Sequence, residues 1–178
     1  MDVLQALAPV SDEYATRPIA SAFNWQDASA DLGAGEWYLV AFRSIRRAEA
    51  DEERLTLFDE LAHQEAAISP GFVHYFKGPR ASDGSCLSFC LWQTRADARA
   101  AAGRPDHVRA VSLIDEMYES YNLEFHRVAR AVDGPLTFEA YDRAPVHGMP
   151  AVPADQGPAP ILGESLAPHL PVQPAPAL

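Results

Sequence analysis

The chain has little cysteine and no cluster of metal-ligating residues. Its 178 residues include two cysteines, Cys86 and Cys90. If the segment between them is a strand, their side chains lie about 13 Å apart, which is too far for a disulfide. A zinc site needs more Cys or His at closer spacing. We therefore expect two small hydrophobic side chains in a reduced protein, and no bound metal.

The chain also lacks long hydrophobic runs and a basic stripe. No apolar run reaches membrane-spanning length, and residues 1–10 lack the basic start of a secretory signal peptide. The net charge is −11, from 14 Lys+Arg against 25 Asp+Glu. We therefore expect no nucleic acid and no membrane among its partners, and a cytoplasmic location.

Motifs of several common enzyme classes are missing too. Gly33-Ala34-Gly35 precedes a predicted strand instead of following one, so it is no dinucleotide-binding loop. The sequence holds no Ser-His-Asp order and no H-E-x-x-H. The chemistry, if the protein performs any, must rest on residues outside these motifs.

Four segments rich in aromatic and β-branched residues predict strands. They are residues 37–45, 71–77, 86–93 and 136–141. Residues 51–68 predict a helix after the first strand, because acids fill its first turn and apolar residues follow one side. Asp83-Gly84 predicts a hairpin between the second and third strands.

A second helical region is predicted between the third and fourth strands. A short helix covers residues 94–102, and a long one runs from Asp106 to about Val132. Apolar residues recur there at steps of three and four. They are Val111, Ile114, Tyr118, Tyr121, Phe125 and Val128. The resulting β-α-β-β-α-β order predicts an α+β fold, a ferredoxin-like sandwich.

Composition divides the chain into three parts. Residues 1–34 mix small and acidic residues with a few apolar ones, and predict an extended N-terminal arm that Phe23 and Trp25 pin to the core. Residues 35–145 form the ferredoxin-like domain. Residues 146–178 are rich in Pro and Ala, which predicts a disordered tail.

A ferredoxin-like sheet has helices on one face only, and the other face needs cover. In the third strand an apolar set of residues alternates with a small and polar set. The apolar set is Leu87, Phe89 and Leu91, and the other is Cys86, Ser88, Cys90 and Trp92. We expect the apolar set under the helices and the small, polar set toward a partner, with Thr137, Glu139 and Tyr141 beside it.

The predicted domain resembles antibiotic-biosynthesis-monooxygenase-like (ABM) domains of the dimeric α/β-barrel superfamily. The matching motifs are W-Y-L-V-A-F-R-S from Trp37, S-P-G-F-V-H-Y-F from Ser69, C-L-S-F-C-L-W-Q-T-R-A-D-A-R from Cys86, and R-P-D-H ending at His107. The resemblance covers about residues 36–143. It implies a homodimer that closes a barrel, and a pocket between the sheet and the helices of each subunit.

The resemblance also implies a range of activities. ABM-like proteins include cofactor-independent monooxygenases acting on polyketide phenols, isomerases, cyclases and haem-degrading enzymes. We expect a small aromatic or polyketide-like ligand and an enzyme that needs no cofactor. A non-catalytic ligand-binding or structural dimer of the same fold is the alternative. A pocket containing His107 or Arg43 would favour the enzyme.

Haem is the minor alternative. His107 lies where haem-degrading relatives carry their iron-binding histidine. Those relatives also need an asparagine on the first strand and a tryptophan in the preceding helix. Here Arg43 takes the first position, and residues 96–103 contain no tryptophan. The resemblance therefore disfavours haem.

Three residues are candidates for catalysis. His107 begins the predicted long helix, where the helix dipole favours a neutral imidazole that serves as a general base; the alternative is an exposed helix residue. His74 stands amid aromatic residues, as a second proton carrier or as a hydrogen-bonded core histidine. Arg43 lies in an apolar strand, so it either holds a developing anion or pairs with a carboxylate such as Glu139 or Asp142.

Three other residues have simpler interpretations. His63, beside acids on the first helix, is expected to face solvent. Tyr118 and Tyr121 belong to the predicted helical stripe, and we expect both mainly in the core; the alternative is that their hydroxyls edge a pocket.

Overall fold

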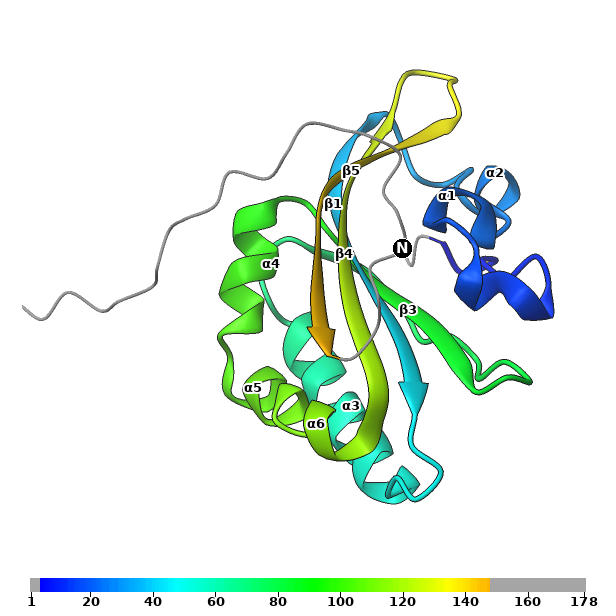
Figure 1. The fold of residues 1–178 in the computed structure, drawn as a ribbon. Coiled ribbons are helices and arrows are strands. Elements are labelled where there is room, and N and C mark those ends of the chain that lie inside the picture. Colours follow the sequence, from blue (N-terminus) through cyan, green and yellow to red (C-terminus); the bar gives the residue numbers. More distant parts are fainter. Residues whose placement is uncertain (1–3, 148–178) are drawn as a thin grey trace, which may run out of the picture.

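A five-stranded antiparallel sheet separates two layers of helices in the computed structural model of the chain (Figure 1). The structure describes residues 4–147, and side chains up to residue 141. The strands are β1 (Gly35–Arg46), β2 (Phe72–Phe76), β3 (Ser85–Trp92), β4 (Tyr118–Arg130) and β5 (Leu136–His147). The helices are η1 (Asp12–Thr16), α1 (Ile19–Ala22), α2 (Trp25–Ala28), α3 (Glu52–Ala67), α4 (Arg95–Ala102), α5 (Pro105–Val111) and α6 (Ile114–Met117).

The strand order is β2-β3-β1-β4-β5. The first four of these strands have the order of a ferredoxin-like sheet, with α3 between β1 and β2 and with α4 to α6 between β3 and β4. The predicted α+β, ferredoxin-like class is therefore confirmed. β5 extends the sheet through a tight turn at Asp133, whose φ of 57° is left-handed.

The predicted long helix from Asp106 to Val132 is wrong. α5 and α6 are short, and residues 118–130 form β4, which pairs with β1 along its whole length. β4 carries aromatic and apolar residues on both faces because both faces are covered. Tyr121 and Phe125 point to one face and Val128 to the other. Their spacing imitates a helical period, although the β-favouring Tyr and Phe make a strand.

Residues 4–34 fold onto the sheet as η1, α1 and α2, and we name them the N-terminal cap. The prediction of an extended arm is wrong in this respect. Phe23 and Trp25 are 3% and 5% exposed, and they pack on Phe89. Figure 1 shows α1 and α2 on the opposite side of the sheet from α3 to α6. The cap and the sheet therefore share one core.

The two faces of the sheet are the reverse of those expected. Leu87, Phe89 and Leu91, at most 1% exposed, form a cluster with the cap. We name this face the outer face. The face with Cys86, Ser88, Cys90 and Trp92 lies under α3 to α6. Full burial of a large apolar side chain contributes about 1.5–3 kcal/mol, and the cap supplies that burial in place of the helices.

Local sequence explains where α3 begins and ends. The Asp51 carboxylate accepts a hydrogen bond from the Arg54 amide at 2.9 Å, and Glu52 and Glu53 occupy the first turn. After the helix, Gly71 has a φ of 73°, a left-handed value that turns the chain into β2. These residues fix α3 across the sheet.

Two further observations complete the fold. None of the described helices is both long enough and apolar enough to cross a membrane. β5 runs to His147, so the first residues of the predicted tail belong to the strand. The rest of that tail, from residue 148, lies outside the described residues.

Candidate functional site

A cavity of about 570 Å³ lies between the sheet and α3 to α6. This volume falls within the range of small-molecule sites, about 300–1,000 Å³. The structure therefore contains the pocket that the sequence resemblance implies, on the helical side of the sheet.

The cavity exists because both of its walls carry small side chains. On the helices, alanines face the sheet: Ala62, Ala66, Ala98, Ala101 and Ala102. On the sheet, Ser44, Cys86, Ser88 and Cys90 face the helices. Small residues on both walls cannot fill the space between a sheet and a helical layer about 10 Å away. The same residues that looked like a dimer surface thus form the floor of a pocket.

Aromatic side chains surround this floor. They are Tyr38, Phe42, Phe58, Tyr75, Trp92, Tyr118, Tyr121 and Phe125. Tyr38 and Phe125 are stacked, with ring centroids 6.1 Å apart and an angle of 13° between planes. Such walls suit a planar apolar ligand, because rings stack on rings.

His107 lines the cavity from the first turn of α5. The Glu65 carboxylate on α3 accepts hydrogen bonds from the backbone amides of Asp106 and His107, at 2.9 and 3.1 Å. This contact fixes the beginning of α5 against α3. Burial lowers the pKa of the half-buried His107 ring, and the charge of Glu65 opposes that shift in part. The imidazole is therefore neutral at pH 7 and can accept a proton.

A second polar group lies on the cavity wall formed by α3 and β2. The Tyr75 hydroxyl donates a hydrogen bond to Asp59 Oδ1 at 2.7 Å, and Lys77 Nζ lies 2.6 Å from Asp59 Oδ2. The His63 ring packs on Tyr75 with centroids 4.8 Å apart. Burial, followed by the charge of Asp59, raises the pKa of Tyr75 well above 10. Tyr75 therefore keeps its proton at every physiological pH.

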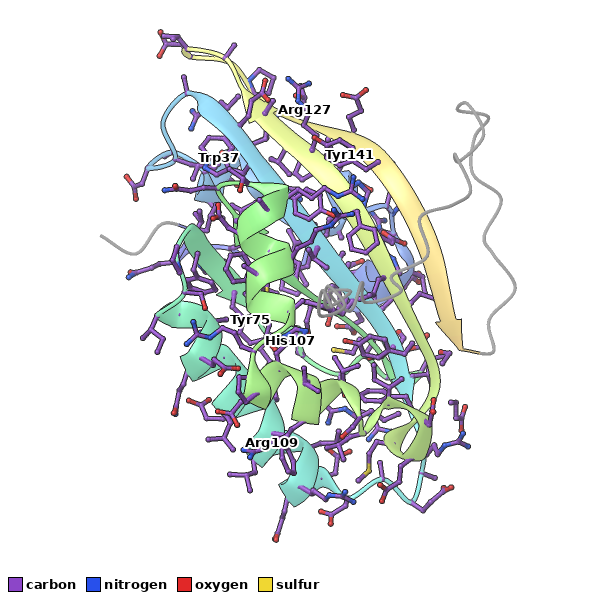
Figure 2. The ribbon with its side chains drawn as sticks, turned by 90° about the vertical axis from the view of Figure 1, so that its left-hand side faces the viewer. Trp37, Tyr75, His107, Arg109, Arg127 and Tyr141 are labelled. Carbon is purple, nitrogen blue, oxygen red and sulfur yellow. The ribbon has the colours of Figure 1, made fainter. Side chains whose placement is uncertain are left out.

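His63 lines the cavity and is half-buried, so the expectation that it faces solvent is wrong. In Figure 2, which looks from the helical side, Tyr75 and His107 are labelled in the same part of the view. Both side chains line the same cavity. The cavity thus has a neutral histidine on α5 and a tyrosine–carboxylate pair on β2 and α3.

Two arginines reach the cavity from α4, one turn apart. The guanidinium of Arg95 lies 5.9 Å from the ring centroids of both Tyr38 and Tyr141. Cation–π contacts of this kind hold an arginine in place. Arg99 also lines the cavity, and among the residues that the structure describes it has no ion pair. Positive charge therefore stands at the α4 side of the cavity.

The Cys90 thiol, one of two in the floor, is unreactive. Burial raises the pKa of Cys90 to about 12, and the Asp59 carboxylate adds to the shift. A thiol with this pKa stays protonated at pH 7, and it is the thiolate that acts as nucleophile. Within residues 4–141, no three His, Cys, Asp or Glu side chains gather as a metal site.

The structure places Arg43 away from the cavity, on the outer face. Its Nε donates to Glu124 Oε1 at 2.8 Å, and its other nitrogens donate to the carbonyl oxygens of Ala15 and Arg17 in the cap. Of the two interpretations of Arg43, the structure has the carboxylate pair, with Glu124 as the partner in place of Glu139 or Asp142. His74 also lies on the outer face, with its ring centroid 6.1 Å from that of Phe89.

Sequence reasoning found His107 but missed Asp59, His63, Tyr75 and Arg99. One available signal was the spacing of Asp59, Ala62, His63 and Ala66, which places small and polar residues on one face of a helix. The alanine-rich stretch 98–102 was another. The three proposed catalytic residues are not together, because alternation in β1 and β2 turns Arg43 and His74 to the far face.

Fold and cavity define the class: a ferredoxin-like α+β protein with an aromatic small-molecule pocket. Residues 1–140 match the family described as PB2B2.08-like. The match covers more than half of the chain, so the chain belongs to this family. It includes the N-terminal cap together with the sheet and helices.

No curated protein matches the chain. Solved structures align with it over its core. SnoaB of Streptomyces nogalater, described as a cofactor-independent oxygenase, has 16% identity and a TM-score of 0.42, covering 55% of this chain and 95% of its own. Rv0793 of Mycobacterium tuberculosis has 17% identity and a TM-score of 0.45, covering 53% and 95%. A putative antibiotic biosynthesis monooxygenase of Nitrosomonas europaea has 12% identity and a TM-score of 0.42, and the alignment covers 61% of this chain and 89% of that one.

These structures include ABM-type proteins, the kind that the sequence resembles. The ferredoxin-like core is established by the strand order itself.

Proposed function

We propose that the protein is an ABM-like enzyme that binds a planar aromatic phenol in the cavity and removes a proton from it with His107. The observation that carries this proposal is a neutral, half-buried histidine on the wall of an aromatic cavity. By the criterion set from the sequence, a pocket containing His107 favours the enzyme over a structural dimer. Five residues are expected to fill the pocket of a merely structural dimer: Phe89, Leu91, Phe138, Tyr118 and Tyr121. The first three pack on the outer face, and the two tyrosines line the cavity without filling it.

The cavity walls support an aromatic ligand. Tyr38 and Phe125 provide parallel rings, and Trp92 closes the same wall. The floor of Ser44, Ser88 and Cys90 adds small polar atoms beneath the ligand. Pockets that are mainly apolar with a few polar groups both bind and orient such molecules.

Proton abstraction is the step that His107 supports. A general base works best when its pKa lies near or below the working pH, so that the free base is present. Burial provides this condition for His107. The backbone hydrogen bonds to Glu65 hold α5, and with it the imidazole, at the cavity wall.

The developing anion would be stabilised from α4. The sequence assigned that task to Arg43, which lies on the outer face. Arg99 lines the cavity, and Arg95 stands beside it on the rings of Tyr38 and Tyr141. Fixed positive charge near a phenolate or enolate lowers the barrier to its formation.

Tyr75 would hold a hydroxyl group of the substrate. Its own proton is donated to Asp59, which leaves the phenol oxygen to accept a hydrogen bond from the ligand. Lys77 Nζ lies 2.6 Å from the other oxygen of Asp59 and holds that side chain in position. This pair lies on the β2 side of the cavity and would orient a phenol relative to His107.

The overall reaction proposed is oxidation of a ring methylene by dioxygen, without a bound cofactor. The two C–H bonds of the methylene break, a C=O bond forms with one oxygen atom, and the other leaves as water. The substrate supplies the electrons, and dioxygen accepts them. His107 takes up the first proton, and the resulting carbanion is the species that reacts with dioxygen.

The test uses 1,8-dihydroxyanthrone, with dioxygen uptake and quinone absorbance as readouts. We expect turnover by the full chain and a loss of about 100-fold or more in His107→Gln, typical of a missing general base. Arg109→Gln is the matched control, since Arg109 is on the same helix with its side chain 64% exposed. Binding without turnover would overturn the enzyme in favour of a ligand-binding protein. Absence of binding would overturn both.

A further inference from the structure

The outer face of the sheet is the kind of surface on which oligomers form. It is wide, apolar and carries no helix from the α3 to α6 layer (Figure 1). Five of its residues, from β1, β3 and β4, would be exposed on an isolated sheet: Leu39, Ala41, Leu87, Phe89 and Val128. In the structure each of them is at most 1% exposed. These five residues are therefore covered, and what covers them is the N-terminal cap.

Aromatic residues of the cap reach strands across the sheet. Phe23 contacts Phe76 on β2 and Phe89 on β3, with ring centroids 4.8 and 5.5 Å apart. Trp25 contacts Phe89 and, at 5.0 Å, Phe138 on β5. The cap thus spans the sheet from one edge strand to the other.

Polar contacts fix the cap to the central strand β1 and to its neighbour β4. Arg43 on β1 donates to carbonyl oxygens of Ala15 and Arg17, and the latter distance is 2.6 Å. Arg130 on β4 donates to those of Ser29 and Leu32. Ala15 and Arg17 lie at the end of η1, where a short helix leaves carbonyls without intrahelical partners, and Ser29 and Leu32 lie in the turn that follows α2. The sheet therefore carries dedicated donors for the backbone of the cap.

A second copy of the chain cannot use the same face. To pack its sheet there it would have to displace Phe23 and Trp25, and to break the contacts of Arg43 and Arg130. The drive for a sheet face to associate is its exposed apolar area, and the cap has already removed that area from water.

We infer that the N-terminal cap takes the place of a second chain, so that the protein is a monomer whose cavity is complete within one chain. The expectation of a homodimer rests on the family resemblance and on a bare sheet face, and in this chain the cap packs on that face. The inference is independent of the reaction proposed above, because it concerns the face of the sheet opposite the cavity.

Native mass spectrometry and light scattering of the full chain provide the first test. Across micromolar concentrations we expect the mass of a single chain, 19.4 kDa. A dimer of twice that mass would overturn the inference. Neither result depends on finding a substrate. A dimer would therefore overturn the inference and leave the proposed function standing, and a monomer without activity would overturn the proposed function alone.

Hydrogen exchange tests the position of the cap directly. The amides of Val10 and Asn24 donate to the carbonyls of Ala22 and Ala8, both at 3.1 Å, within the cap. We expect these amides to exchange about 100-fold or more slowly than in an unstructured peptide. Exchange at the unstructured rate would show that the cap does not cover the sheet, and would contradict the inference.

A variant tests whether the cap prevents association. In the Phe23→Ser/Trp25→Ser double variant, the outer face loses its two largest covering rings. We expect concentration-dependent dimers and binding of an apolar dye. Gln26→Ser is the matched control, because Gln26 follows Trp25 on α2 and is exposed; it should stay monomeric. A folded double variant that remains monomeric and binds no dye would overturn the inference. If the double variant does not fold, the wild-type mass and exchange measurements still decide.

Discussion

Arg43 and Glu124 face each other across β1 and β4, with 2.8 Å between Arg43 Nε and Glu124 Oε1. Both side chains are largely buried, 13% and 10% exposed. His126 Nε2 lies 3.4 Å from the other carboxylate oxygen. This buried pair lies on the outer face, beneath the cap, and it joins the sheet to the backbone of residues 15 and 17. Its role is structural, and it explains why an arginine stands in an apolar strand.

Removal of Arg43 should therefore affect stability and leave ligand binding unchanged. Arg43→Ala leaves the Glu124 carboxylate buried without its main partner, which typically costs about 3–5 kcal/mol. We expect a lower urea midpoint and an unchanged dissociation constant for an aromatic probe, measured where the variant is folded. A variant of normal stability that no longer binds the probe would contradict this assignment.

The sequence predicted the parts of the fold that have strong local signals. β1, β2, β3 and α3 lie within a few residues of their predicted positions. β4 was missed because a strand covered on both faces has apolar residues at odd and at even positions. In residues 118–128 the spacing of these residues imitates the apolar stripe of a helix. The faces of the sheet were reversed because the cap, which buries the more apolar one, has no periodic pattern of its own.

In the candidate site, too, the sequence predicted the local features and missed the contacts between separate elements. His107 was found because it begins a helix after Pro105, which is a local feature. The pairing of Asp59 with Tyr75 joins residues 16 positions apart, and it depends on how α3 lies across β2. The cavity itself arises from small residues on two separate elements. Neither relationship can be read from one segment alone.

The activity of the protein should depend on pH through His107. Burial lowers the pKa of His107 below its usual 6.5. The free base is then present above that lowered value, so kcat/KM for the anthrone should rise with a midpoint below 6.5 and be flat at pH 7–8. A pH–rate profile measures this. A midpoint at or above 6.5 would contradict the burial of a working base.

The same shift predicts a change in stability. The folded state binds the His107 proton less well than the unfolded state does. The contribution of His107 to the free energy of unfolding should therefore be complete above pH 6.5 and decrease as the pH drops below that value. In His107→Gln this part of the pH dependence should disappear. Urea unfolding at several pH values, for wild type and variant, would detect it.

Tyrosine ionisation provides a prediction for alkaline solution. Burial raises the pKa values of Tyr14, Tyr75, Tyr118 and Tyr121 above the usual 10. At pH 10.5–11 the absorbance of phenolate should therefore report fewer ionised rings in the folded chain than in the unfolded one, of the six in the sequence. Since the unfolded state releases these protons first, stability should fall as the pH rises above about 10. Equal titration of folded and unfolded chains would contradict the burial described.

Gly78 is required where the cap, β2 and β3 meet. A Cβ at this position would lie 2.1 Å from the Leu87 carbonyl oxygen and 2.6 Å from the Tyr14 hydroxyl. Gly78→Ala should therefore destabilise the fold by about 1–3 kcal/mol or more, because the backbone of β3 must move. Gly33→Ala is the control, since a Cβ at Gly33 meets nothing within 4 Å. Chemical denaturation of the two variants should give clearly different midpoints, and equal midpoints would contradict the close packing at Gly78.

The most direct test of the account is calorimetric titration of 1,8-dihydroxyanthraquinone into the full chain and into Ala62→Trp. Ala62 lines the cavity from α3, and a tryptophan there would fill the space that the small residues leave. We predict one binding site per chain in the wild type, about 10-fold or more weaker binding in Ala62→Trp, and the same far-ultraviolet circular dichroism spectrum for both. Equal affinity in the two proteins, or no binding to the wild type, would contradict the claim that this cavity is the functional site.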